Sequence, residues 1–87
     1  MEVKKVDVWD TYVNKESGEL MHFDIIVPSG TAKEKVFEFG NEYLRSRKID
    51  GKIEASKCNF CHSEIIQKDW LKSIKEKGYF IYEMEGC

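Results

Sequence analysis

Two stretches near the start of the chain are rich in β-branched and aromatic residues, and a polar segment separates them. The first stretch runs from Val3 to Val13 and the second from Leu20 to Val27, with Asn14–Glu19 between them. Asn, Ser and Gly in the separating segment are residues that favour chain reversal. The pattern therefore predicts a β-hairpin.

A four-residue loop, with Asn14 opposite Glu19, sets the predicted register of this hairpin. Side chains alternate between the two faces of a sheet, so this register gathers most apolar residues on one face. The cross-strand pairs of that predicted core face are Tyr12–Met21, Asp10–Phe23, Val8–Ile25 and Val6–Val27, with Asp10 as the polar exception. The same register places a second group together on the opposite face: Trp9, Thr11, His22 and Asp24.

The rest of the chain alternates between helical and extended patterns. Thr31, followed three residues later by Glu34, forms a capping-box pattern, and apolar residues at helical spacing predict a helix over 31–47. A short strand over 52–56, a helix over 67–77 that stops at Gly78, and a strand over 79–84 follow. Because residues 79–82 are apolar on both faces, we expect an interior strand that runs parallel to a neighbour.

These elements predict one α+β domain over residues 1–87, in the order ββαβαβ. The expected architecture is a mixed four-stranded sheet with two helices packed on it. A chain of 87 residues, 41% of them hydrophobic, can build one core but not two. The single proline and the lack of a Gly/Ser-rich linker also argue against a second domain.

The charge and composition of the chain limit the classes of partner that it is expected to bind. With 14 Lys and Arg against 16 Asp and Glu, the net charge is −2, which argues against nucleic acid and against a membrane surface. No apolar run approaches the roughly 20 residues of a membrane helix, and acidic residues interrupt the place of a signal peptide. We expect a cytoplasmic protein with free thiols, and an open sheet edge would leave room for a homo-oligomer.

Four segments of the sequence together resemble a small bacterial family, domain of unknown function 2024. The resemblance runs nearly from end to end of the chain. It implies a compact α+β domain, usually a stand-alone chain, with no assigned activity, substrate or cofactor, and it transfers no functional residues. The segments that carry it are Val8–Val13, Met21–Ile25, Phe60–His62 and Lys77–Cys87.

Cys58-x-x-Cys61-His62 is the strongest local signal for chemistry, and the sequence predicts that it lies in a loop or knuckle. Two thiols at this spacing can bind one metal ion across a tight turn. A structural zinc site needs four ligands, so a residue from elsewhere must complete it. The predicted metal set is Cys58, Cys61, His62 and Cys87, with His22 as an alternative fourth ligand.

Three other interpretations fit the same motif. The pattern is also the attachment signature of c-type haem, but covalent haem generally requires export, and no signal peptide is visible. A thiol redox pair is the second alternative, although a thioredoxin-like motif usually follows a first strand and opens a long helix. In the third, Cys58 and Cys61 are structural thiols that pack a tight loop.

The predicted hairpin face offers a second candidate site, for a ligand. Asp24 lies two residues from His22 and can orient its imidazole, while Trp9 beside Thr11 would form a flat apolar wall. The alternative is a hydrogen-bonded polar cluster beneath a covering helix. No nucleophile elbow, Gly-rich phosphate loop or other recognisable catalytic constellation is present, which argues against an enzyme. The remaining hypotheses are zinc coordination, a non-catalytic binding or interaction module, and a thiol redox protein.

Overall fold

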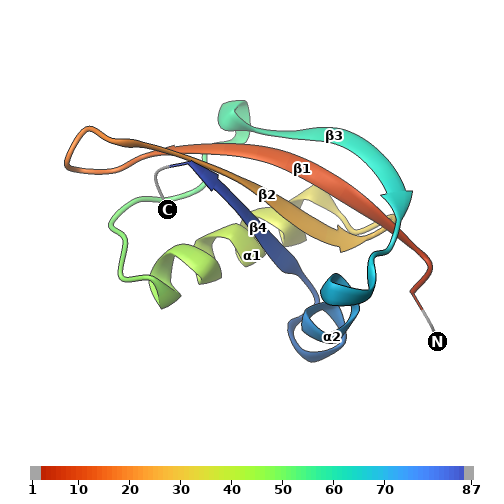
Figure 1. The fold of residues 1–87 in the computed structure, drawn as a ribbon. Helices are drawn as coiled ribbons and strands as arrows, with labels where there is room; N and C mark the ends of the chain where they lie inside the picture. Colours follow the sequence, from red (N-terminus) through yellow and green to blue (C-terminus); the bar gives the residue numbers. More distant parts are fainter. Residues whose placement is uncertain (1–2, 86–87) are drawn as a thin grey trace.

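A computed structural model describes residues 3–85 and contains four strands and two α-helices (Figure 1). The α+β class and the order ββαβαβ predicted from the sequence are confirmed. The elements in chain order are β1 (Lys5–Asn14), β2 (Leu20–Pro28), α1 (Lys33–Ser46), a 3-10 helix (Ala55–Lys57), β3 (Cys58–Ile65), α2 (Lys68–Lys77) and β4 (Phe80–Glu85).

The strands form one sheet in the order β3-β1-β2-β4, and all three neighbouring pairs are antiparallel. The prediction of an interior, parallel last strand is therefore wrong, because β4 lies at the edge beside β2. Helix α2 sits at one end of the sheet, and the chain enters β4 from that end (Figure 1). Strand β4 has apolar side chains on both faces because each face packs on a different core. Ile81 packs on the core beneath α1, and Phe80 packs on the core beneath α2.

The hairpin register differs by one residue from the prediction. Asn14 lies opposite Leu20, and Asp10 lies opposite Asp24, around a five-residue loop. Two backbone hydrogen bonds close this loop: the Lys15 amide donates to Glu19 and the Gly18 amide donates to Lys15, both at 2.9 Å. Because a shift of one residue exchanges the two faces of a strand, the predicted core face and the predicted opposite face are both wrong.

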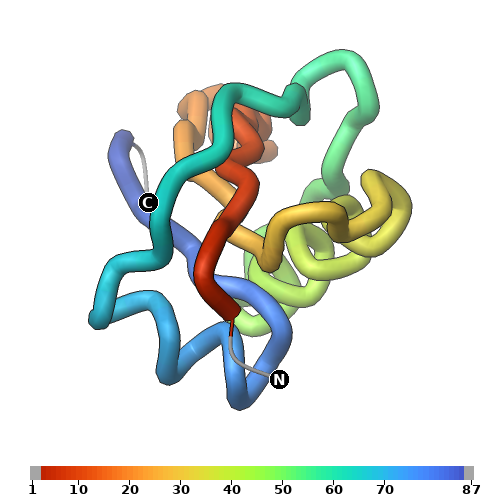
Figure 2. Tube along the Cα trace, turned by 90° about the vertical axis from the view of Figure 1, so that its right-hand side faces the viewer, coloured from red at the N-terminus to blue at the C-terminus, as the bar shows by residue number. Residues whose placement is uncertain are grey.

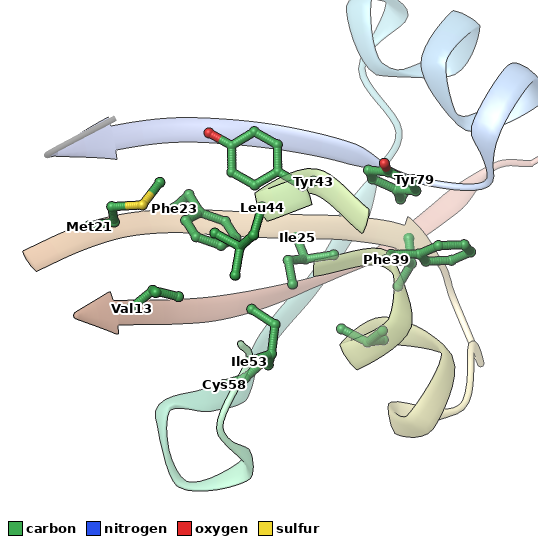
Figure 3. Close-up of a cluster of buried hydrophobic side chains, with 12 residues drawn as sticks. Val13, Met21, Phe23, Ile25, Phe39, Tyr43, Leu44, Ile53, Cys58 and Tyr79 are labelled. Atoms are coloured by element: carbon green, nitrogen blue, oxygen red, sulfur yellow. The ribbon is translucent and has the colours of Figure 1, made fainter. Parts of the chain in front are cut away.

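Each face of the sheet carries its own core, with α1 over one and α2 over the other (Figure 2). The expectation of one core is therefore wrong, because the sheet lies between the two helices and divides the buried side chains into two clusters. On the α2 face, Trp70 and Ile74 of the helix pack on Val6, Val8 and Ile26. The larger core lies on the α1 face (Figure 3) and contains Val13, Met21, Phe23, Ile25, Val27, Val36, Phe39, Tyr43, Leu44, Ile53, Cys58 and Tyr79.

Helix α2 is much shorter than the strands it covers. Its ten residues span about 15 Å, whereas the ten residues of β1 span about 33 Å. The helix therefore covers the part of its face where Val6 and Val8 lie, and it does not pack on the part where Asp10 and His22 lie. Polar side chains occupy that uncovered part, which is where the candidate site lies.

Three further local predictions are corrected. Helix α1 begins at Lys33, and Thr31 donates to the Pro28 carbonyl at 2.6 Å instead of capping the helix. Residues 58–62 lie in strand β3 rather than in a knuckle, and the predicted strand over 52–56 is absent. Most side chains of β3 are exposed, so the strand has no hydrophobic alternation and forms because β1 offers it an edge.

A substitution at Gly40 tests how closely α1 packs on the sheet. A Cβ atom at this position would lie 2.6 Å from Ile53 Cγ1 and 2.9 Å from Ile25 Cδ1. We expect Gly40→Ala to lower the free energy of unfolding by about 1–2 kcal/mol, because overpacking outweighs the gain in helix propensity. Urea denaturation measures this change. The exposed Glu38→Ala is the control and should change the free energy by less than about 0.5 kcal/mol; equal midpoints for the two variants would contradict the prediction.

Candidate functional site

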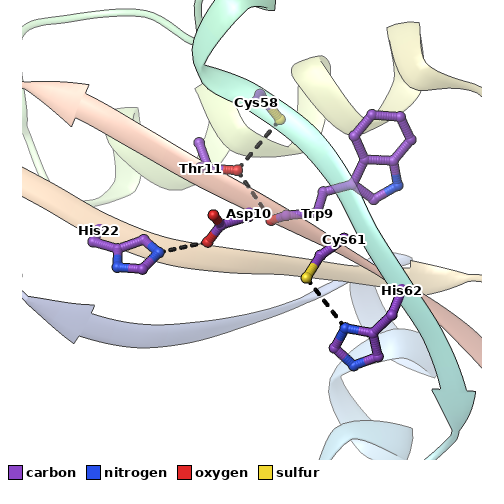
Figure 4. A network of polar contacts seen from close by, with 7 residues as sticks. All are labelled: Trp9, Asp10, Thr11, His22, Cys58, Cys61 and His62. Atoms are coloured by element: carbon purple, nitrogen blue, oxygen red, sulfur yellow. Dashed lines mark hydrogen bonds and ion pairs between the residues drawn. The ribbon is translucent and has the colours of Figure 1, made fainter.

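A group of three potential metal ligands lies on the part of the sheet that α2 leaves uncovered. Asp10 comes from β1, and His22 and Asp24 come from the adjacent strand β2. One ligand atom from each residue lies within 4.8 Å of the other two. His22 Nε2 lies 2.5 Å from Asp10 Oδ1 (Figure 4), and all three residues are partly buried.

The position of the imidazole is set by the strand pairing. Tyr12 lies opposite His22, and their rings stack with centroids 4.2 Å apart and planes inclined by 12°. Because β1 and β2 are the two central strands, hydrogen-bonded neighbours hold both of them. The ligand atoms are therefore held by rigid elements rather than by loops.

The surroundings of Asp24 raise the pKa of its carboxyl group. Burial, together with the hydrogen bond and the negative charge of Asp10, raises the pKa of Asp24 to about 6. The nearby His22 and His62 act in the opposite direction, but their effect is smaller. Above this pKa, Asp24 adds a negative charge close to the Asp10 carboxyl group, and a bound cation would stabilise that charge.

Sequence reasoning identified His22 and Asp24 but missed Asp10. In the predicted register Asp10 faced Phe23 and was the one polar residue on an apolar face. The observed register places it opposite Asp24 instead. That polar misfit was the available signal, because shifting the pairing by one residue removes it and creates a polar cluster.

The other two residues of the predicted ligand face lie on the far side of the sheet. Thr11 is fully buried, and its hydroxyl lies within hydrogen-bond distance of the Trp9 carbonyl oxygen and of Cys58 Sγ, at 3.1 and 3.3 Å. Trp9 packs against the α1 core and makes an edge-to-face contact with Phe60. Trp9 and Thr11 therefore do not share a surface with His22 and Asp24.

The predicted cysteine ligands are also separated. Cys58 is buried in the α1 core, where burial raises the pKa of its thiol, and the hydrogen bond from Thr11 only partly offsets this. Cys61 is exposed, and its sulfur lies 3.3 Å from His62 Nδ1 (Figure 4). Within residues 3–85, Cys58, Cys61 and His62 do not form a three-ligand group. Cys87 lies outside the described residues.

A cavity of about 230 Å³ adjoins the candidate metal ligands. Asp24 belongs to both, since its carboxylate is one of the three ligands and its side chain also lines the cavity. The wall contains both polar and apolar residues, as the walls of small-molecule sites commonly do. The lining residues are Val8, Asp24, Ile26, His62, Glu64, Gln67, Trp70 and Tyr82.

Comparison with known proteins identifies the family of the chain. Residues 4–84 match the family described as Domain of unknown function (DUF2024), and the chain belongs to that family. The fold is similar to the NMR structure of protein NE1680 from Nitrosomonas europaea, with a TM-score of 0.83 and 38% sequence identity. The match covers 95% of this chain and 98% of that one. A comparison with curated proteins gave no match.

Neither helix in the described part of the chain has the length and apolar character needed to cross a membrane.

The raised pKa of Asp24 predicts how stability depends on pH. A carboxyl group with a pKa of 3.8 when unfolded and about 6 when folded stabilises the folded state when protonated. This contribution is present below about pH 4 and is lost as the pH rises through about 6. In the presence of chelator, we expect Asp24→Asn to exceed wild type in stability above pH 7, by roughly 1–2 kcal/mol.

Urea denaturation of both proteins between pH 4 and pH 8 measures this difference. The matched control is Asp69→Asn, which removes an exposed carboxylate in the first turn of α2. An Asp24→Asn variant less stable than wild type at every pH would show that the carboxylate is not destabilising at neutral pH.

The strand position of the cysteines predicts that Cys58 and Cys61 do not form a disulfide. Three residues along a strand span roughly 9–10 Å between Cα atoms, whereas a disulfide needs less than about 7 Å. Mild oxidation of a Cys87→Ser variant, followed by mass spectrometry, should show no loss of two hydrogens. A closed disulfide in that variant would restore the redox hypothesis.

Proposed function

We propose that this protein binds a divalent transition-metal ion, such as zinc, through Asp10, His22 and Asp24. The convergence of one imidazole nitrogen and two carboxylate oxygens within 4.8 Å carries the proposal. Zinc bonds of about 2.0–2.2 Å to such atoms place the ligands roughly 3–4 Å apart. Small side-chain rotations from the present geometry would therefore complete the site.

The charge of the site favours a cation. Asp10 and Asp24 lie directly opposite each other, and a shared proton is the alternative way to relieve their repulsion. A metal ion would replace that proton and would also replace the contact between His22 and Asp10. Imidazole suits zinc and iron, and carboxylate suits manganese, so this ligand set favours such ions over soft ones.

Three protein ligands leave a metal ion with an open coordination position. Closed structural zinc sites have four protein ligands, whereas sites that act on a bound molecule have three and keep one position free. Here the adjoining cavity shares Asp24 with the ligand set. The arrangement therefore supports a metal site that presents its ion to a small ligand.

The sequence-based alternatives have less support from the described residues. The set Cys58, Cys61, His62 and Cys87 stays a prediction, but Cys58 faces the α1 core and Cys61 lies on an exposed edge strand. An interaction module is supported by exposed apolar side chains on the two edge strands, Phe60 and Tyr82. A cytoplasmic location also stays a prediction.

Metal titration tests the proposal directly. Full-length protein freed of metal with chelator should bind about one zinc ion per chain, and binding should raise the melting temperature. Asp10→Asn and His22→Gln should each weaken binding by at least ~100-fold, because each removes a ligand. Binding should also weaken below about pH 6, where a proton occupies Asp24.

The controls separate the two possible ligand sets. Cys61→Ser and Cys87→Ser should bind zinc as wild type does. Loss of binding in these cysteine variants, with Asp10→Asn unaffected, would favour the cysteine set instead. Failure of the wild-type protein to bind zinc, manganese or iron more tightly than millimolar would contradict the proposal for any ligand set.

A further inference from the structure

A β-bulge in β3 brings together residues that a regular strand would separate. The pairing with β1 shifts between Val8 and Trp9, so that Val8 faces His62, Trp9 faces Phe60, and Cys61 has no partner on β1. Neighbouring residues of a regular strand point to opposite faces, whereas a bulge redirects the extra residue. Cys61 Sγ and His62 Nδ1 consequently lie 3.3 Å apart (Figure 4).

Glu64 completes a line of three functional groups. It lies two residues beyond His62, on the same side of the strand, and its Oε2 is 2.5 Å from His62 Nε2. An ionised carboxylate can only accept a hydrogen bond, so the imidazole proton is placed on Nε2. The lone pair of Nδ1 then faces the thiol, which is the arrangement of nucleophile, base and orienting acid.

The surroundings of this line favour reaction with a small neutral molecule. Cys61 is exposed, in contrast to the buried Cys58. His62 and Glu64 also line the 230 Å³ cavity, and Trp70 and Tyr82 are among its other lining residues. The carboxylates of Asp24 and Glu64 in the cavity lining disfavour an anionic substrate, and the aromatic rings of Trp70 and Tyr82 suit an apolar acyl group.

We propose that Cys61 accepts an acyl group from a small, uncharged activated ester or thioester. Cys61 Sγ attacks the carbonyl carbon while His62 Nδ1 takes the thiol proton, and a carbon–sulfur bond forms. The bond from the carbonyl carbon to the leaving oxygen or sulfur then breaks, and His62 returns the proton to the leaving group. The reaction needs no redox partner and does not depend on the proposed metal.

Acylation by p-nitrophenyl acetate tests this reaction. Full-length wild-type protein, reduced and kept in chelator, should release p-nitrophenolate and gain one acetyl group on Cys61, located by peptide mass spectrometry. Its second-order rate constant should exceed that of N-acetylcysteine at the same pH by at least about tenfold. The chelator separates this outcome from metal binding, so either proposal can fail alone.

Variants assign the role of each group. Cys61→Ser should lose the reaction, and the matched control Cys58→Ser should keep it. His62→Gln should slow the reaction by about 100-fold or more, because it removes the base. Glu64→Ala should slow it about tenfold, and Glu64→Gln should restore most of the rate, because the amide oxygen can still accept from Nε2–H and so position His62.

Three results would overturn the proposal. The first is acetylation of lysines with Cys61 unmodified, and the second is a rate no greater than that of N-acetylcysteine. The third is a wild-type rate in His62→Gln, which would show that the imidazole takes no part. A Glu64→Gln variant as slow as Glu64→Ala would remove the positioning role of Glu64.

Discussion

The pairing register between β1 and β2 is the constraint on which the rest of the structure depends. These two strands form the centre of the sheet, and β3 and β4 are added to their outer edges. The register decides which residues face α1 and which face α2. It also places Asp10 opposite Asp24, so the same pairing that builds the larger core assembles the candidate metal ligands on the other face.

The difference in size between the two cores explains why the polar cluster with Asp10 and His22 lies on the α2 face of the sheet. The α1 face holds the larger cluster of buried side chains, whereas α2 covers only one end of the other face. Side chains beyond α2 remain partly open to solvent, which is why a cluster with Asp10 and His22 is tolerated there. Stability therefore resides mainly on the α1 side and candidate chemistry on the α2 side.

The two proposed activities meet at one cavity while using different strands. Asp24 reaches the cavity from the central strand β2, and His62 and Glu64 reach it from the edge strand β3. An ion held near Asp24 and an acyl group held near His62 would therefore occupy neighbouring positions. The bulge at Cys61 matters because an edge strand can deform locally without disturbing the central pairing.

The sequence by itself determined the element order and the α+β class, and it located the helices to within a few residues. Apolar spacing defines α1 and α2 locally, and Gly78 ends α2 in a left-handed conformation. Only the tertiary structure decided the hairpin register, because loops of four and five residues both suit the segment 14–19. Packing against both helices selects between them. The tertiary structure likewise decided that residues 58–65 form a strand. Their mostly exposed side chains show no hydrophobic period, and the free edge of β1 supplies the backbone hydrogen bonds.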